Sequence, residues 1–173
     1  MFFYVKVEGH VQSPIIFSLP DILAMPAKKL EIVLECAGNK RKYFWPDVYG
    51  EQWGKGAMSQ GVWKGVSLQT LFTYTGIINT AKEVVFQGFD YGKRTDSNEK
   101  HHFSRSLSVQ QALHPDTILA YQYNEKALTL EHGFPLRLIV PSMYAMASVK
   151  WVNKIEVIDH NFNGSFQKDD YVY

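Results

Sequence analysis

The chain has 173 residues, of which 46% are hydrophobic, and a formal charge of +1. This length fits a single domain over residues 1–173, and the composition excludes a disordered chain. The balanced charge gives no reason to expect nucleic acid as a partner. The single cysteine, Cys36, excludes an intramolecular disulfide and a zinc site built from several cysteines.

The sequence shows no N-terminal signal peptide and no apolar segment long enough to span a membrane. The N-terminal residues lack the basic segment and the long apolar segment of a signal peptide. No apolar run approaches the roughly 20 residues needed to span a bilayer. We therefore expect a cytoplasmic protein without a membrane span, or a periplasmic one if an upstream segment is missing.

Short strands and short helices follow one another without regular βαβ order, which predicts a β-rich α+β fold. Residues 37–62 and 90–102 lack a clear period and are expected to be loops. In chain order, we expect a strand at 2–8, a helix capped by Ser18, a strand at 29–36, a helix capped by Ser67, a strand at 83–87, a helix beginning at Ser108, and strands at 118–123, 136–140 and 149–157.

Cys36 is the first candidate for chemistry. Alternation along 29–36 places it on the apolar strand face, where a lone cysteine is usually a buried small hydrophobic residue. Its setting favours a reactive thiol, because Gly38 lets the backbone approach a bulky group and the basic residues 40–42 favour the thiolate. A solvated face explains the basic residues as well.

A second cluster lies at residues 132–137. His132 and Arg137 bracket a turn that Gly133 and Pro135 make rigid, and the two side chains could converge on one anionic group. Arginine suits phosphate because its planar fork donates two hydrogen bonds. A hairpin turn with an incidental surface histidine explains the same residues equally well.

Lys150, in the segment 148–151, forms a third cluster with its neighbours. It stands between apolar residues just ahead of a predicted strand. A lysine in such a place usually extends its ammonium group to solvent. The alternative is a point charge directed at a phosphate.

Five segments in order and at matching spacing, with a sixth near the C-terminus, resemble one family: the molybdopterin-binding domain of sulfite oxidases and assimilatory nitrate reductases. Bacterial methionine sulfoxide reductase catalytic subunits belong to the same superfamily. The resemblance implies that family's β-rich α+β fold, with mixed sheets and short helices, and one molybdenum–molybdopterin cofactor per chain. The matching segments are residues 35–41, 62–68, 119–124, 132–137 and 149–151, with 166–171 as the closing segment.

The resemblance also assigns roles to residues. Cys36 matches the thiolate that ligates molybdenum beside the dithiolene of molybdopterin, and a soft thiolate suits such a metal. Tyr171 looks like the family's active-site tyrosine. The residues that match cofactor-binding positions are Asp90, His132, Arg137, Ser148, Val149 and Lys150.

The sequence departs from the family pattern in several places. The Arg-Asn-His stretch that opens the domain in sulfite oxidases and their C-terminal immunoglobulin-like domain are absent, as are haem and flavin domains. Asn124–Glu125 stands where relatives often have Asn-Gly, so we expect a different hairpin turn. Candidates for binding a substrate anion, each explained equally well as a surface charge, are Lys40, Arg41, His101, His102 and Arg105.

These observations predict a sulfite-oxidase-like, molybdenum-cofactor-dependent oxidoreductase. An oxo group would move to or from a small oxyanion or sulfoxide-type substrate, and electrons would pass to an external one-electron carrier. In such enzymes the cofactor carries the chemistry and the protein binds, orients and tunes it. The alternative is a molybdopterin-binding module or partner subunit without independent catalysis.

Overall fold

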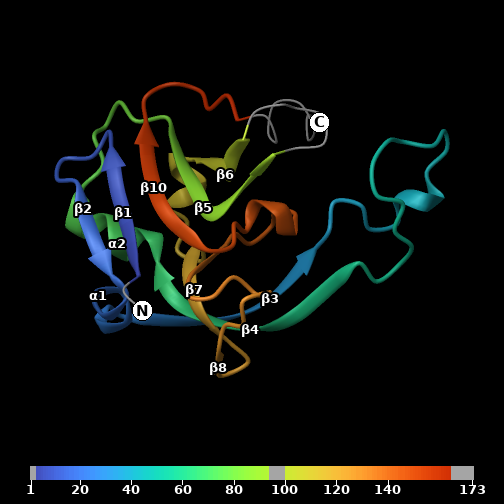
Figure 1. The fold of residues 1–173 in the computed structure, drawn as a ribbon, viewed down its shortest axis with the longest axis horizontal. Coiled ribbons are helices and arrows are strands. Elements are labelled where there is room, and N and C mark those ends of the chain that lie inside the picture. The colour runs from blue at the N-terminus through green and yellow to red at the C-terminus, as the bar shows by residue number, and fades with distance from the viewer. Residues whose placement is uncertain (1–2, 94–99, 165–173) are drawn as a thin grey trace.

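The computed structural model describes residues 3–93 and 100–164, and their strands form two mixed or antiparallel sheets joined by short helices (Figure 1). The first sheet has the order β2 (Ile15–Ser18), β1 (Tyr4–Gly9), β10 (Val152–Ile158), β5 (Glu83–Lys93) and β6 (Lys100–Ser108). The second has the order β3 (Ala27–Glu35), β4 (Met58–Ser67), β7 (Ile118–Tyr123) and β8 (Lys126–Ala127), with β9 (Arg137–Ile139) also paired to β7. The helices are α1 (Leu19–Ala24), α2 (Leu68–Thr75) and α3 (Val109–Ala112), with 3-10 turns η1 (Arg41–Tyr43) and η2 (Ala145–Ala147). The predicted β-rich α+β class is confirmed.

The first sheet brings distant parts of the chain together. Strand β1 pairs in parallel with β10, with Lys6 opposite Lys154, while the other pairings are antiparallel. The last described strand therefore lies between the first strand and β5. This arrangement fixes the segment just before β10, which carries Lys150, against the middle of the sheet.

The three helices begin where their serine caps predict. The hydroxyls of Ser18, Ser67 and Ser108 each accept a hydrogen bond from the backbone N–H three residues later, which satisfies a donor in the first turn. Helix α2 ends at Gly76, whose positive φ of 63° is accessible to glycine. Among the described residues, no helix has the length and apolar character that crossing a membrane requires.

The expectation of loops at 37–62 and 90–102 was partly wrong. Strand β4 begins at Met58, β5 continues to Lys93, and β6 begins at Lys100, with Tyr91 opposite His102. These strand ends are polar or exposed on both faces, so they lack the alternation that reveals a half-buried strand. Backbone pairing with a neighbouring strand forms them instead.

The hairpin between β7 and β8 also differs from expectation. Asn124 and Glu125 have φ values of 48° and 64°. Both central residues are therefore left-handed, as an Asn-Gly type I′ turn requires. Glu125 adopts this conformation despite its side chain, and its carboxylate pairs with Lys29 at 3.2 Å.

The core has two parts that meet at β7 and β9. Leu119 and Leu138 belong to the larger cluster, while their neighbours Ile118 and Ile139 belong to the smaller one. Alternate residues of a strand face opposite sides, so both faces of β7 and β9 are buried. The smaller cluster also contains Trp63, whose ring contacts Arg137 at the candidate functional site.

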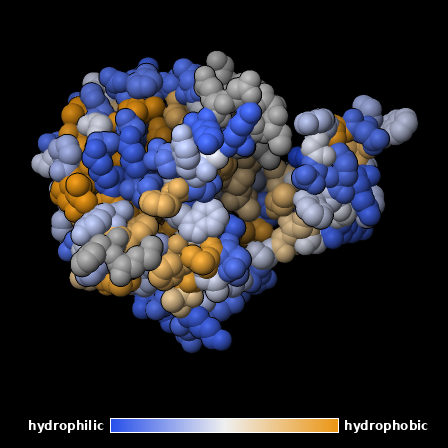
Figure 2. All heavy atoms as spheres, in the orientation of Figure 1, coloured by the Kyte–Doolittle hydropathy of each residue, from blue (hydrophilic) through white to orange (hydrophobic). Residues whose placement is uncertain are grey.

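Residues 37–57 form an arm that extends away from the two sheets, coloured cyan in Figure 1 and standing apart from the body in Figure 2. The chain enters this arm directly after Cys36 and returns from it into β4. Trp45 and Tyr49 on the arm are fully or almost fully exposed. The surface is hollowed between the arm and the body (Figure 2).

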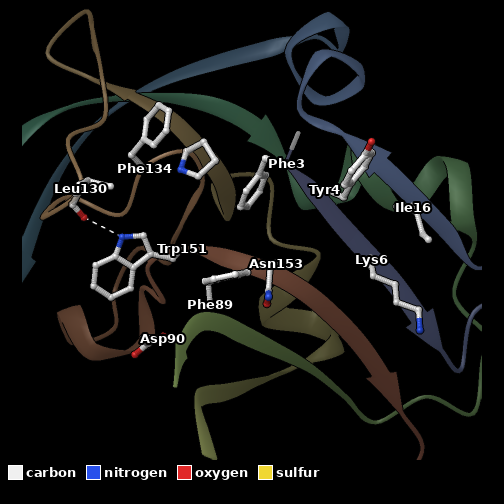
Figure 3. Close-up of a pocket in the computed structure, with 11 residues that line it drawn as sticks. Phe3, Tyr4, Lys6, Ile16, Phe89, Asp90, Leu130, Phe134, Trp151 and Asn153 are labelled. Atoms are coloured by element: carbon white, nitrogen blue, oxygen red, sulfur yellow. Dashed lines mark hydrogen bonds between the residues drawn. The ribbon is translucent and has the colours of Figure 1, made fainter. Parts of the chain in front are cut away.

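An apolar groove of about 660 Å³ opens on the body beside β1. Figure 3 shows the side chains that line it. They come from β1, β2, β5, the connection between β8 and β9, and the beginning of β10. The groove therefore lies between the first sheet and the connection from β8 to β9, and it is not a depression within one element.

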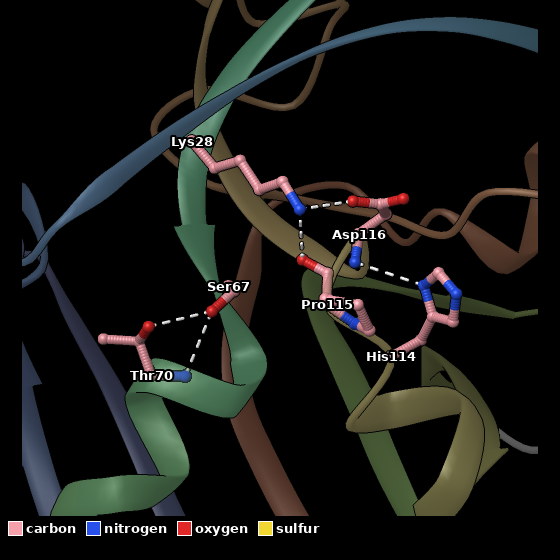
Figure 4. Close-up of polar contacts among 6 residues, drawn as sticks. All are labelled: Lys28, Ser67, Thr70, His114, Pro115 and Asp116. Carbon is pink, nitrogen blue, oxygen red and sulfur yellow. Dashed lines mark hydrogen bonds and ion pairs between the residues drawn. The ribbon is translucent and has the colours of Figure 1, made fainter.

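Lys28, the second residue of β3, connects that strand to the loop before β7 (Figure 4). Its ammonium group donates to the carbonyl oxygen of Pro115 at 3.1 Å and forms an ion pair with Asp116. The backbone N–H of Asp116 in turn donates to Nδ1 of His114 at 3.1 Å.

The Lys28 contacts give a stability prediction. Lys28→Met should lower the free energy of unfolding by about 0.5–1.5 kcal/mol, because a hydrogen bond to a carbonyl oxygen and a half-buried ion pair are lost together. Lys29→Met is the matched control, since its pair with Glu125 is 57% and 79% exposed and should contribute close to nothing. Urea unfolding measures both; equal losses would contradict the assignment.

Candidate functional site

A cavity of about 200 Å³ collects most of the residues that the resemblance assigns to cofactor binding. Their role in binding stays a prediction, but the structure brings five of the six around one space. The predicted residues that line the cavity are Asp90, Arg137, Ser148, Val149 and Lys150, and the other lining residues are Phe103, Ala145, Met146 and Trp151.

Arg137 is the most deeply buried charge in this cavity. Its side chain leaves β9 and only 8% of the residue is exposed. The guanidinium carbon lies 5.2 Å from the ring centre of Trp63, a cation–π contact. Nε donates to the carbonyl oxygen of Ser148 at 3.3 Å, and Nη1 donates to that of His132 at 3.5 Å.

No carboxylate among residues 3–93 and 100–164 forms an ion pair with Arg137. Burial lowers the pKa of its guanidinium to about 10, so the group stays charged at neutral pH. A buried charge without a counter-ion is costly. The site is therefore suited to an anion supplied from outside the chain.

Lys150 places a second positive charge at the same cavity. Its ammonium group lies 5.4 Å from the ring centre of Trp151. Burial, and after it the charge of Arg137, lower the pKa of Lys150, while Asp90 and Glu131 act in the opposite direction. The two cations thus lie close enough to repel each other, and an anion between them would relieve that repulsion.

Asp90 is the carboxylate of the cavity wall. Burial is the main influence on it and raises its pKa, against smaller opposing effects from its own backbone, His102 and Lys150. The carbonyl oxygen of Asp90 lies 3.1 Å from Nδ1 of His102. The side chain of Asp90 fits closely over Gly88, where an added Cβ would collide with Oδ1.

Ser148 and Val149 contribute mainly through their backbone. The Ser148 carbonyl holds Arg137, and its hydroxyl accepts the N–H of Val140 at 3.2 Å. The N–H of Val149 donates to the carbonyl oxygen of Ala147 at 3.1 Å, and the carbonyl oxygen of Val149 accepts from the N–H of Leu138 at 2.8 Å. These bonds fix the cavity wall and the position of the guanidinium.

His132 does not line the cavity, although its carbonyl oxygen holds Arg137. The imidazole is exposed and stacks on Tyr123, with ring centres 5.2 Å apart and planes 19° apart. Its Nδ1 lies 2.9 Å from the hydroxyl of Thr129. The structure thus places His132 beside the site, with its ring directed to other partners.

Cys36 follows β3 and is partly buried. Its sulfur accepts a hydrogen bond from the N–H of Gly38 at 3.4 Å. Cys36 is not a lining residue of the cavity. However, Leu34 on the same strand face packs in one cluster with Trp63 and Ala145. Trp63 contacts Arg137, and Ala145 lines the cavity.

The turn after Cys36 is held by Asn39, which is 8% exposed. Its Nδ2 donates to Glu35 at 2.6 Å, and its Oδ1 accepts the N–H of Ala57 at 3.1 Å. An added Cβ on Gly38 would lie 2.8 Å from the Glu51 carbonyl oxygen. The arm itself, and not only an incoming group, therefore requires glycine at this position.

The basic residues after the turn mostly contact other residues of the arm. Arg41 donates to the carbonyl oxygens of Ala37 at 3.3 Å and Glu51 at 3.4 Å. Lys40 and Lys42 are both exposed, and the ammonium group of Lys42 lies 5.1 Å from the ring centre of Tyr43. The interpretation of this run as a solvated face therefore suits Lys40 best.

The remaining candidates lie elsewhere. His101, His102 and Arg105 lie on β6, and His102 contacts the Asp90 backbone. Tyr171 lies outside the described residues.

A family model described as the oxidoreductase molybdopterin binding domain matches residues 2–166. The chain belongs to this family. It is 32% identical to a sulfite oxidase of Arabidopsis thaliana over 178 residues, covering 96% of this chain and 44% of that protein. It is 33% identical to nitrate reductase [NADH] 1 of Phaseolus vulgaris, covering 96% of this chain and 19% of that protein.

A solved structure agrees with the sequence relatives. The sulfane dehydrogenase SoxCD from Paracoccus pantotrophus matches with a TM-score of 0.79 and 27% identity, covering 95% of this chain and 40% of that chain. The chain thus spans less than half the length of each of these three proteins. It is a molybdopterin-binding oxidoreductase domain of the sulfite oxidase and nitrate reductase type.

The residues present fit a molybdenum cofactor with a phosphate group. Within the described ranges, no group of three or more His, Cys, Asp and Glu side chains could hold a metal by itself. A metal at Cys36 would therefore take its other ligands from the cofactor. Arg137 and Lys150, neither of which has an ion-pair partner among the described residues, would supply the positive charge that a phosphate needs.

Sequence reasoning missed the residues that position these groups. Trp63, which is 2% exposed, supports Arg137, and Trp151 donates from Nε1 to the Leu130 carbonyl oxygen at 2.9 Å. Trp63 stands in a segment that the family resemblance already included, so that segment was the available signal. Gly133 packs on Lys150, whose Cα would lie 3.1 Å from an added Cβ.

Gly133 provides a test of this packing. Gly133→Ala should lower the free energy of unfolding by about 1–3 kcal/mol more than Gly56→Ala. Both positions have positive φ, 99° and 96°, so both substitutions strain the backbone by about 1–2 kcal/mol. Only Gly133 has neighbours that an added methyl group would meet.

Urea unfolding of the two variants at one pH measures the difference. Equal losses would mean that the backbone near Gly133 has room to adjust, and that Lys150 is not held by this contact.

Proposed function

We propose that this chain is a sulfite-oxidase-like, molybdenum-cofactor-dependent oxidoreductase acting on a small oxyanion or sulfoxide-type substrate. The observation that carries the proposal is the cavity beside Arg137 and Lys150, where two cations lie together and neither has an ion-pair partner among the residues described. Membership of the molybdopterin-binding family supports the same conclusion.

In this proposal, two regions of the chain bind different parts of the cofactor. Arg137 and Lys150 bind its phosphate, and Asp90 accepts hydrogen bonds from its pterin. Cys36 supplies the single protein sulfur to molybdenum, and the Gly38 N–H steadies that sulfur. When bound, the cofactor supplies two-electron oxo-transfer chemistry; the side chains hold and orient it.

The substrate would approach from the side of Cys36. An oxyanion needs positive groups there, and of the two candidates that closely follow the thiol in sequence, Lys40 and Arg41, only Arg41 is partly buried. Its guanidinium already donates to Ala37 and Glu51, so it is fixed in place and would offer only its remaining N–H groups. Lys40, His101, His102 and Arg105 are further candidates, and Tyr171 is the proposed active-site tyrosine.

A second candidate function is a cofactor-binding subunit without its own turnover. The engagement of Arg41 by carbonyl oxygens favours it, because this leaves fewer free donors for a substrate anion. Turnover with an artificial electron acceptor separates the two functions. A loaded chain that oxidises sulfite or reduces a sulfoxide is an enzyme, whereas a loaded chain inactive with every such substrate is a carrier or partner subunit.

Cys36→Ser tests the proposed ligand. The variant, expressed in a molybdopterin-competent host, should lose redox turnover because a hydroxyl is a poor substitute for a soft thiolate. Its free energy of unfolding should change little, since the side-chain volume is almost conserved. Elemental analysis of molybdenum and activity assays are made together; unchanged turnover would exclude Cys36 as the ligand.

Arg137→Ala tests the phosphate contact. Losing a charge-assisted hydrogen bond should weaken cofactor retention by about 1.5–3 kcal/mol, roughly a tenfold or greater loss. Arg41→Ala is the matched control, because that guanidinium does not line the cavity. Molybdenum retained after extensive dialysis measures the effect. Full retention by Arg137→Ala would refute the anchor.

A further inference from the structure

Strand β3 forms one edge of the second sheet. Within the described ranges it pairs with β4 alone, over nine residues, so its other side presents backbone groups that no neighbouring strand binds. Such an edge is a template for another strand. The edge strands β2 and β8 have only four and two residues, and the long edge strand β6 is buried at residues 105–107.

Two hydrogen bonds show which residues of β3 direct their backbone groups to the free edge. The N–H of Cys36 donates to the carbonyl oxygen of Ala57 at 2.9 Å, so Cys36 faces the β4 side. Val62, which lies opposite Glu31, directs its carbonyl oxygen away from β3, to the N–H of Asn124 at 2.8 Å. Because these directions alternate along antiparallel strands, the odd-numbered residues of β3 direct their N–H and carbonyl groups outward.

The side chains of four of these outward-facing residues are also exposed. In chain order they are apolar, positive, negative and apolar. This order is complementary to itself when it is reversed, as an antiparallel partner strand reverses it. The four residues are Ala27, Lys29, Glu31 and Val33.

The register between two such strands decides which charges meet. With Leu30 at the centre, Lys29 of each copy lies opposite Glu31 of the other, and Val33 lies opposite an alanine. With Glu31 at the centre, two glutamates would oppose each other, and with Ile32 there, Glu31 would oppose the apolar Val33. Opposite charges directly across a strand pair stabilise it and like charges destabilise it. The edge is therefore charge-complementary to a second copy of itself.

Neither charge is held firmly within its own chain. Lys29 pairs with Glu125 at 3.2 Å, where the two side chains are 57% and 79% exposed. Glu31 accepts from the Gln60 amide at 2.7 Å in an exposed contact. Surface contacts of this kind contribute little to stability. Both side chains can therefore exchange these partners for partners on a second copy.

We propose that β3 pairs in antiparallel register with β3 of a second copy of this chain, with Lys29 of each copy opposite Glu31 of the other. The two second sheets then join into one sheet across a two-fold axis at Leu30. One strand edge on each side is a small interface, so we expect weak association, with a Kd on the order of 10–100 µM. No residue of β3 lines the Arg137 cavity, and the association needs no cofactor.

Sedimentation equilibrium of the full chain, at concentrations on both sides of this Kd, measures the association. Lys29→Glu and Glu31→Lys each place like charges opposite one another, so each alone should weaken association about tenfold or more. The double variant Lys29→Glu/Glu31→Lys should recover the wild-type affinity. A mixture of the two single variants should form a mixed dimer. Lys55→Glu, at an exposed position on the arm, changes the charge equally and should leave the affinity unchanged.

Val33→Pro tests the backbone pairing. It removes an outward N–H and leaves the ladder with β4 intact, and proline is tolerated on an edge strand when its nitrogen faces solvent. Association should be lost while the circular dichroism spectrum is retained. If this variant does not fold, the charge variants at exposed positions decide the question.

Three results would overturn the proposal. The first is a wild-type chain that stays monomeric at all these concentrations. The second is a double variant that associates no better than the single variants, because the charges would then not face each other as stated. The third is a folded Val33→Pro chain that associates as the wild type does.

Discussion

The buried guanidinium of Arg137 is the feature on which the site depends. It is held over Trp63 and by the carbonyl oxygens of Ser148 and His132, yet no carboxylate among the described residues neutralises it. Those contacts orient the charge without compensating it, and burying an uncompensated charge works against folding. A chain that keeps such a group, with Lys150 beside it, has a cavity suited to an anion from outside. The phosphate of the family's cofactor would meet this need.

The two sheets are both required to build this cavity. Asp90 comes from β5 of the first sheet, Arg137 from β9 of the second, and the segment 145–151 passes between them into β10. The Ser148 hydroxyl accepts from the N–H of Val140 and the Val149 carbonyl oxygen accepts from the N–H of Leu138, and these hydrogen bonds hold that segment. The face of β3 that leads to Cys36 packs in the same core cluster as Trp63. The thiol and the cationic cavity are thus attached to one rigid framework.

Local signals predicted the helices well, because Ser18, Ser67 and Ser108 cap them through contacts only three residues away. Strand ends formed by pairing alone, such as 91–93 with 100–102, carry no apolar alternation and could not be found. The resemblance supplied Arg137 and Lys150, and the structure brings them together. The contact of Trp63 with Arg137 could not be derived from local sequence patterns, since it depends on β7 pairing with both β4 and β9. The left-handed Glu125 likewise reflects the hairpin and not its own preference.

We propose one interaction that links the family to particular residues of this chain, which is that the anion of the cofactor binds between Arg137 and Lys150. A crystal structure of the molybdenum-loaded chain tests this claim most directly. We predict phosphate oxygens within hydrogen-bond distance of the Arg137 guanidinium and the Lys150 ammonium group, in the cavity that also contains Asp90. A loaded chain whose phosphate lies elsewhere, with both cations turned to solvent or paired within the protein, would contradict it.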